Sequence, residues 1–242
     1  MKTKVILLAL LARVCGAQAQ GLVIFNNTSA TKVSTNSFSI FPPASGPIAA
    51  GANLYYFALF YSTTATTVHG TNGAVILGNG DFFGTFVIGD PNWTFAGYGV
   101  NSSTLPGHFF SSSPNSDGST TINGVAGGSF AQFVVLWWSA NLDSTLAELE
   151  NSWYSQSGSR LIGESAVSGP IQLGDGALIP ASNLFGSSSP LIQGFTLGGI
   201  PVPEPTTLAL AGAGLAGLFS FRRRSPVQKI QRPAGLLVAG SK

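Results

Sequence analysis

An uncharged apolar run near the C-terminal end constrains this chain more than any other feature. Residues 206–221 are sixteen residues without a charge, and Arg222, Arg223 and Arg224 follow at once. As an α-helix the run would be about 24 Å long, against a bilayer core of roughly 30 Å. Arginine side chains can reach the interface while the bilayer thins, so the run can span it. Because arginines remain on the cytoplasmic side, the sequence predicts a transmembrane helix with all earlier residues outside the cytoplasm.

The N-terminal end is consistent with export. Lys2 and Lys4 precede an eight-residue apolar stretch, and Ala17-Gln18-Ala19 has the small-x-small pattern of a signal peptidase site, with Ala17 and Ala19 as its small residues. We therefore predict a signal peptide, in part helical, at residues 1–19. The chain's one cysteine, Cys15, would leave with it, so the mature protein is expected to fold without disulfides.

A proline-bracketed glutamate stands directly before the apolar run. The segment Val202-Pro203-Glu204-Pro205 is expected to be extended, because proline disfavours helix at its own position and at the preceding residue. Together with the apolar helix and the arginine cluster, this segment resembles the PEP-CTERM sorting signal of Gram-negative bacteria that make extracellular polysaccharide. The resemblance implies recognition by an exosortase, a membrane cysteine protease that cuts near the motif. Glu204 would be the charged recognition element, and Pro203 and Pro205 its rigid frame.

These signals divide the chain into four parts. Residues 1–19 form the signal peptide, 20–200 the exported domain, and 201–224 the sorting signal with its helix at 206–221. Such signals usually end soon after their arginines, but here a basic segment, 225–242, follows. We expect it to be disordered and cytoplasmic, where it could lie on the anionic inner leaflet.

The exported domain is acidic although the whole chain has a formal net charge of +2. Between Gln20 and Pro201 only Lys32 and Arg160 are basic, against eight acidic residues, so the net charge there is 2 − 8 = −6. The basic residues that remain lie at the two ends. No basic stripe is present to neutralise phosphates, which argues against nucleic-acid binding.

Short apolar and aromatic runs between glycine- and serine-rich turns predict a mainly β domain. We expect an antiparallel, jelly-roll-like β-sandwich with one short helix. The block 130–138 is the most apolar and should be central. The expected strands are Gly21–Asn26, Leu54–Tyr61, Ala74–Leu77, Phe82–Ile88, Phe130–Trp138, Ser159–Ser165 and Leu191–Leu197.

The helix and the loops follow from local patterns. Leu142, Leu146, Leu149 and Trp153 repeat at helical spacing, after Asp143 or Ser144 as the N-terminal cap. A turn at residues 78–81 joins two of the expected strands into a hairpin. Composition predicts loops at 31–52, 101–128 and 180–190.

A second resemblance concerns the exported domain itself. Many PEP-CTERM proteins begin their mature chain with a strand ending in Phe-Asn-Asn, as at Phe25-Asn26-Asn27. They continue with an aromatic strand like 55–60, and later with a Gly-Glu-Ser strand like 163–165. The resemblance supports a β-rich envelope protein and implies no activity.

Residues for catalysis are few. His69 and His108 lie beside glycine in turn-like contexts, and no Gly-x-Ser-x-Gly elbow is present. Asn115-Ser116-Asp117-Gly118-Ser119 has oxygen ligands at alternate positions but lacks the distant glutamate of a calcium loop. We therefore predict no enzyme, metal or cofactor. A secreted glycoside hydrolase is the alternative that paired carboxylates would allow. The carboxylates available by type are Asp81, Asp90, Asp143, Glu164 and Asp175, which we expect in turns, at a helix cap or, for Glu164, facing solvent.

Tryptophans supply the other alternative, a carbohydrate-binding module for extracellular polysaccharide. Trp137 and Trp138 are adjacent, so on a strand they face opposite sides. Trp93, in a turn-like segment, is the best candidate for stacking on a sugar ring. The prediction from the whole sequence is an exported protein of the cell envelope or extracellular matrix with a structural or adhesive role. Its expected partners are signal peptidase, exosortase, the inner membrane in transit and extracellular polysaccharide.

Overall fold

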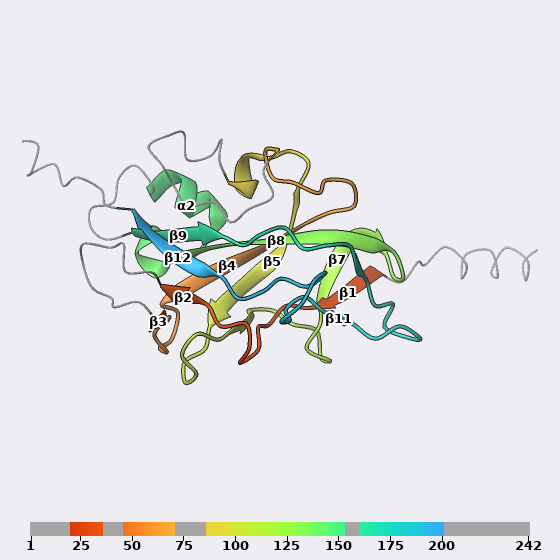
Figure 1. Ribbon diagram of the computed structural model, residues 1–242, viewed down its shortest axis with the longest axis horizontal. Helices are drawn as coiled ribbons and strands as arrows, with labels where there is room; N and C mark the ends of the chain where they lie inside the picture. Colours follow the sequence, from red (N-terminus) through yellow and green to blue (C-terminus); the bar gives the residue numbers. More distant parts are fainter. Residues whose placement is uncertain (1–19, 36–45, 71–85, 153–159, 201–242) are drawn as a thin grey trace, which may run out of the picture. The chain divides into compact units, whose positions relative to one another are not determined.

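The computed structural model describes residues 20–35, 46–70, 86–152 and 160–200 (Figure 1). The chain separates into two compact units, residues 1–202 and 203–242. All of the second unit lies outside the described residues, so the fold below is that of the first unit. The predicted signal peptide, the hairpin turn at 78–81 and the helix at 206–221 also lie outside them.

A large, mostly antiparallel sheet forms the centre of the first unit. Its one parallel pairing joins β12 to β2, and β10 lies beside the beginning of β8. In spatial order the sheet contains β3 (Gly46–Pro47), β2 (Ser34–Thr35), β12 (Thr196–Ile200), β9 (Arg160–Glu164), β8 (Phe130–Ser139), β4 (Tyr55–Ser62), β5 (Thr94–Asn101) and β6 (Phe109–Ser111), with β10 (Ile171–Gln172) added to β8.

The antiparallel pair β4 and β8 lies in the middle of this sheet. The two strands pair along the whole of β4, from Tyr55 opposite Ser139 to Ser62 opposite Gln132. Alternate residues point to opposite faces of a strand. Here both sets are apolar, and nearly every residue of β4 is buried. Antiparallel sheets often leave one face to solvent, so continuous apolar strands of this kind require a cover on both faces.

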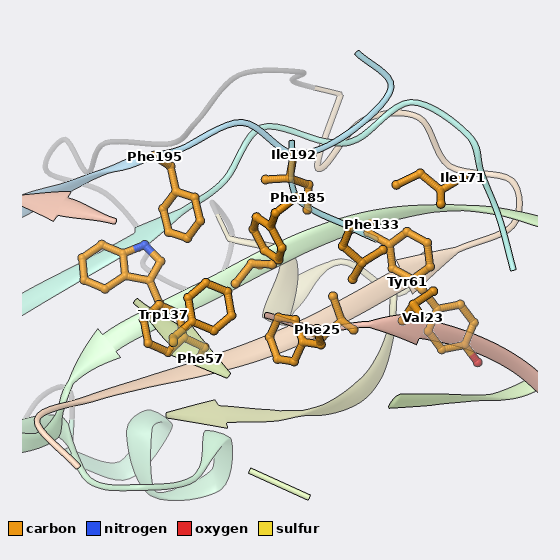
Figure 2. Packing of buried hydrophobic residues seen from close by; sticks show 14 of the residues in the cluster. Val23, Phe25, Phe57, Tyr61, Phe133, Trp137, Ile171, Phe185, Ile192 and Phe195 are labelled. Atoms are coloured by element: carbon orange, nitrogen blue, oxygen red, sulfur yellow. The ribbon is translucent and has the colours of Figure 1, made fainter. Parts of the chain in front are cut away.

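One face carries the larger core, which includes residues of the second sheet. That sheet has β1 (Gln20–Ile24) between β11 (Ser182–Asn183) and β7 (Thr120–Ala126). Figure 2 shows Phe25, the residue after β1, between Phe57 of β4 and Val23 of β1 in the same core. Phe133 and Trp137 of β8 belong to the same cluster. The two sheets are therefore held together by one shared apolar core.

The opposite face of the central strands carries a second core. Ala58, Phe60 and Val134 point into it, alternating with the residues of the first core. Its cover consists of non-strand segments, including residues 64–70 and two 3₁₀ helices. The covering elements are η1 (Val87–Gly89), η2 (Ala140–Leu142) and the short helix α2 (Leu146–Ser152).

Two buried asparagines fasten loops to the sheets. The Asn27 side chain donates to the carbonyls of Thr31 (2.9 Å) and Gly107 (2.8 Å), and accepts the backbone N–H of Phe109 at 2.9 Å. Asn101 accepts the N–H groups that lead into β4 and donates to the loop before it. A side-chain amide can satisfy several buried backbone groups at once, which explains polar residues at these interior positions.

Gly163 makes room for the largest side chain of the first core. It lies directly opposite Trp137 in the β8–β9 pair, and Trp137 is fully buried. A Cβ atom on Gly163 would stand 2.5 Å from Cζ2 of the indole. The glycine is therefore required by the close approach of an aromatic ring across neighbouring strands.

The predicted mainly β class is confirmed, and block 130–138 is central as expected. Strands also appear at three other predicted places, as β1, β4 and β9. The jelly-roll-like sandwich stays a prediction. Among the residues described, no helix is long and apolar enough to cross a membrane.

Several strand predictions were wrong in extent. The last two residues of the expected strand 82–88 belong to the 3₁₀ helix η1. Residues 82–85 and the expected strand 74–77 lie outside the described residues. In the segment 191–197 only the last two residues are in a strand. β5 was not predicted, and the expected loop 101–128 contains β6 and β7. Short strands rich in Gly, Thr and Asn carry little apolar alternation, so tertiary pairing decides them.

The predicted helix exists, but its cap differs from the prediction. Thr145 precedes α2 and accepts the backbone N–H of Glu148 at 3.3 Å, and its hydroxyl donates to the Glu148 carboxylate at 2.9 Å. The Thr145 backbone N–H also donates to the Glu148 carboxylate, which completes a capping box. Asp143 instead has a positive φ of 72° at the end of η2. Trp153 lies outside the described residues.

We predict that Gly163→Ala destabilises the folded protein. The added methyl group meets the rigid Trp137 indole, and overpacking of this kind costs about 1–3 kcal/mol in the free energy of unfolding. Urea denaturation measures the change. Gly97→Ala on β5 is the matched control, because its Cβ would meet only a methyl of Thr120, at 3.5 Å. Equal stability of the two variants would contradict the packing described.

Candidate functional site

Glu164 is a buried carboxyl group in the second core. It is 3% exposed, and its Oε2 accepts the backbone N–H of Val87 at 2.6 Å. On β9 the residues alternate, so Glu164 points to the same face as the buried Ile162. The expectation that Glu164 faces solvent is therefore wrong. A strand glutamate here anchors the first residue of η1, 77 positions earlier in the chain.

Asp90 ends η1 and connects three backbone segments. It is 5% exposed, and its Oδ2 accepts the backbone N–H of His69 at 2.8 Å. Its Oδ1 accepts both the backbone N–H of Asn92 (2.9 Å) and the Asn92 side-chain amide (2.8 Å). The prediction that Asp90 serves a turn is confirmed, with the addition that it also holds His69.

His69 connects Asp90 to the backbone of Phe86. Its backbone has a φ of 44°, and its ring Nε2 lies 3.0 Å from the carbonyl oxygen of Phe86. Because a carbonyl only accepts, the imidazole donates in this contact. Glu164, Asp90 and His69 thus fasten residues 64–70 and 86–93 to one another and to the central sheet. We name these three residues the carboxylate cluster.

The two acids of the carboxylate cluster are driven to opposite protonation states. Burial raises the pKa of Glu164 to about 8, the Val87 N–H lowers it in part, and the nearby Asp90 charge raises it. Burial would also raise the pKa of Asp90, but the hydrogen bonds from His69 and Asn92 outweigh it, and that pKa lies below its ordinary value. Near neutral pH, Glu164 is therefore protonated and Asp90 is ionised.

An open, mainly polar hollow of about 470 Å³ lies beside the cluster. Asp90, His69, Asn92 and Thr66 contribute to its lining, and Glu164 is not among the described residues that line it. An acid pair that hydrolyses glycosides must present both carboxyl groups to the substrate. In the described part of the chain, one acid lines the hollow while the other lies beneath η1, so the cluster has the geometry of an anchor.

The other acidic candidates lie in turns. Asp117 accepts the N–H (3.0 Å) and the hydroxyl (2.6 Å) of Ser119, and these hydrogen bonds lower its pKa. The possible calcium loop is therefore closed on itself as a turn. Asp175 accepts three consecutive backbone N–H groups, from Ala177, Leu178 and Ile179, at 2.8 Å each. Asp81 lies outside the described residues. Within the described ranges no group of three or more His, Cys, Asp or Glu side chains could hold a metal ion.

Trp93 does not offer a sugar-stacking surface. It is 6% exposed, packs in the second core, and donates its indole N–H to the carbonyl of Thr67 at 3.1 Å. Its burial contradicts the candidate role of Trp93 in sugar stacking. Trp137 and Trp138 do face opposite sides of β8 as expected, and both are fully buried.

Exposed aromatic side chains occur instead on β5 and β6, which no sequence pattern had indicated. Phe95 is 39% and Phe110 46% exposed, and Phe95 lies 4.6 Å from Tyr98 between ring centroids. Phe95 is paired with Phe60, and Phe110 with Val100, which follows Tyr98 by two residues. The register of β5 shifts opposite Leu59 and Phe60, so Phe95 and Tyr98 lie on the same face although they are three residues apart. Paired residues of antiparallel strands share a face, so Phe95, Tyr98 and Phe110 lie on one face of the sheet. We name it the aromatic face.

The sorting residues lie outside the described part of the structure. They are Ala17, Ala19, Val202, Pro203, Glu204, Pro205, Arg222, Arg223 and Arg224. The last described strand, β12, ends at Ile200, and in the sequence only Pro201 and Val202 separate it from Pro203.

Comparison with known proteins identifies this C-terminal segment. The family model for the PEP-CTERM protein-sorting motif matches residues 201–224. This motif implies an exported protein with a C-terminal sorting signal that exosortase processes. The chain carries a PEP-CTERM protein-sorting motif, as the resemblance indicated. No curated protein and no solved structure matches the chain.

We predict that Glu164→Gln removes a pH dependence of stability. The unfolded chain ionises Glu164 near its ordinary pKa of 4.5, whereas the folded protein holds the proton until about pH 8. The folded state then binds more protons, so the wild type loses stability as pH rises from 4.5 to 8, by up to roughly 5 kcal/mol. Glutamine stays neutral in both states and can still accept from Val87. Urea denaturation at pH 5, 6.5 and 8 measures the difference.

Glu148→Gln is the matched control for this experiment. Glu148 is exposed, and the hydroxyls of Thr145 and Ser144 lower its pKa, so its contribution is lost only as pH falls below about 4.5. The control variant should therefore follow the wild type between pH 5 and 8. Parallel curves for wild type and Glu164→Gln over that range would contradict a buried, protonated Glu164.

Proposed function

We propose that this protein is a non-enzymatic component of the cell envelope or extracellular matrix, with a structural or adhesive role. The observation that carries the proposal is the sorting motif at 201–224, which implies an exported protein that exosortase processes. Signal peptidase would remove residues 1–19. The helix at 206–221 would hold the protein in the inner membrane, with Arg222–Arg224 and the basic tail inside, until the cut passes the domain to the surface or matrix.

The carboxylate cluster supports a role without catalysis. Its acids, Glu164 and Asp90, accept hydrogen bonds from the backbone N–H groups of Val87, His69 and Asn92. Among the described residues that line the hollow, Asp90 is present and Glu164 is not. A catalytic acid must reach its substrate. A secreted glycoside hydrolase is therefore the less favoured assignment.

The shared apolar core supports the sandwich architecture that we propose for residues 20–200. Strands β1, β4 and β8 contribute to one cluster between the two sheets. Such a domain carries its own core without disulfides, as an exported domain lacking cysteine needs to do. A rigid β domain of this kind suits a structural component that persists outside the cell.

We predict that Glu204→Ala leaves the protein uncut and in the inner membrane. The substitution removes the charged recognition element and keeps both prolines and the apolar helix. Cell fractionation followed by intact-mass measurement reports both the location and the two cuts. Lys229→Ala, a charge removal in the tail beyond the arginines, is the control and should be processed normally. Release of the Glu204→Ala protein at its mature mass would refute exosortase-type recognition.

The aromatic face favours a second candidate function, the binding of extracellular polysaccharide. Aromatic rings on a sheet can stack on sugar rings, and Phe95 and Phe110 expose a large part of their surfaces. No charged residue occurs in β5 or β6, so this surface suits a neutral face of a sugar chain. This binding surface lies on β5 and β6, whereas the sugar-binding candidate predicted from the sequence was Trp93.

For this second candidate we predict that Phe95→Ala combined with Phe110→Ala weakens polysaccharide binding at least about fivefold. Loss of two stacking rings removes about 1–3 kcal/mol of binding free energy, by analogy with single aromatic contacts. Retardation in native gels containing the exopolysaccharide of the producing bacterium measures it. Phe130→Ala is the control, because Phe130 is 56% exposed and pairs with β10, not with β5 or β6. Equal retardation of all three proteins would eliminate the aromatic face as a binding surface.

A further inference from the structure

The final strand of the exported domain is part of the central sheet. β12 lies between β9 and β2 in strand order (Figure 1). Its first residues, Thr196 and Leu197, pair in parallel with β2. Its last three residues pair antiparallel with β9, with Gly198 opposite Ile162, Gly199 opposite Leu161 and Ile200 opposite Arg160. The backbone of β12 is therefore bonded up to the residue before Pro201.

The sorting motif begins where this strand ends. The family match starts at residue 201, directly after Ile200, and Glu204 is four residues from the strand. A protease that cuts near the motif binds the residues on both sides of the cut as an extended segment, through their backbone N–H and C=O groups. In the folded domain, residues 198–200 are paired with β9, so the backbone N–H groups that donate to β9 are not available to a protease.

The composition of β12 also favours separation of its last residues from β9. Two of its three residues paired with β9 are Gly198 and Gly199. Glycine brings no side chain to pack and loses the most conformational freedom when it is ordered in a strand. The central strands β4 and β8, in contrast, are buried on both faces. Local opening free energies vary widely within one fold, and segments with few packed side chains open first.

We propose that residues 198–200 of β12 leave β9 when exosortase binds, so that cleavage of the sorting signal requires local opening of the folded domain. This inference rests on the proposed processing by exosortase. After the cut the strand returns to the sheet, because its pairing partners and residues 196–200 remain with the domain. The fold thus determines how readily the signal is cut, while the motif determines where.

A disulfide staple tests the proposal in the full chain in the producing bacterium. Arg160→Cys with Ile200→Cys links directly opposed residues of β9 and β12, where antiparallel Cα atoms lie within disulfide range. This pair retains the buried residues Leu161 and Ile162. The only natural cysteine, Cys15, lies in the predicted signal peptide. We expect cutting at least tenfold slower than wild type while the staple is oxidised, and recovery when dithiothreitol is added to the cells.

Two controls separate a closed strand from a misfolded domain. Leu22→Cys with Thr121→Cys staples β1 to β7, away from β12, and should be cut at the wild-type rate. A flexible ten-residue Gly/Ser insertion between Ile200 and Pro201 should restore cutting of the oxidised β9–β12 staple, because the motif then reaches the protease while β12 stays closed.

The outcomes are distinct. Cutting of the oxidised β9–β12 staple at the wild-type rate would overturn the proposal, as would a block that the inserted spacer fails to relieve. Absence of cutting in the wild type itself would instead refute exosortase processing, on which this inference depends.

Discussion

The pairing of β4 with β8 is the interaction on which the rest of the structure depends. Both strands are apolar on successive residues, so alternation sends large side chains to both faces of the central sheet. Phe57, Phe133 and Trp137 form one core, and Phe60, Leu136 and Trp138 belong to the other. Each face must then be covered. The second sheet and the segments after β11 cover one face, and η1, η2 and α2 cover the other.

The second cover explains why polar groups occur inside the molecule. Non-strand segments have backbone N–H groups that no ladder satisfies, and burial without a partner is costly. Glu164 and Asp90 supply acceptors for the N–H groups of Val87, His69 and Asn92. On the other side of the sheet, Asn27 does the same for Phe109. Gly163, Glu164 and Asn27 are among the residues in the motifs that resemble other PEP-CTERM proteins, and each has a specific packing or hydrogen-bonding role here.

Sorting and folding meet at one point in the chain. The PEP-CTERM motif is a short linear segment at residues 201–224. The fold nevertheless places a paired strand directly before it, through β12 and its partner β9. In our proposal, cutting of the sorting signal depends on the stability of the pairing between β12 and β9.

The sequence by itself determined the sorting signal, the mainly β class and the centre of the sheet, because these depend on local composition: an apolar run beside arginines, or a long apolar strand such as 130–138. It also indicated a turn role for Asp90. Only the tertiary structure decided that Glu164 is buried and Trp93 covered, and that Phe95 and Phe110 share an exposed face. Those outcomes depend on what packs against each face of a strand. Register and cover bring together residues as distant in sequence as Val87 and Glu164, and no local pattern specifies such a pairing.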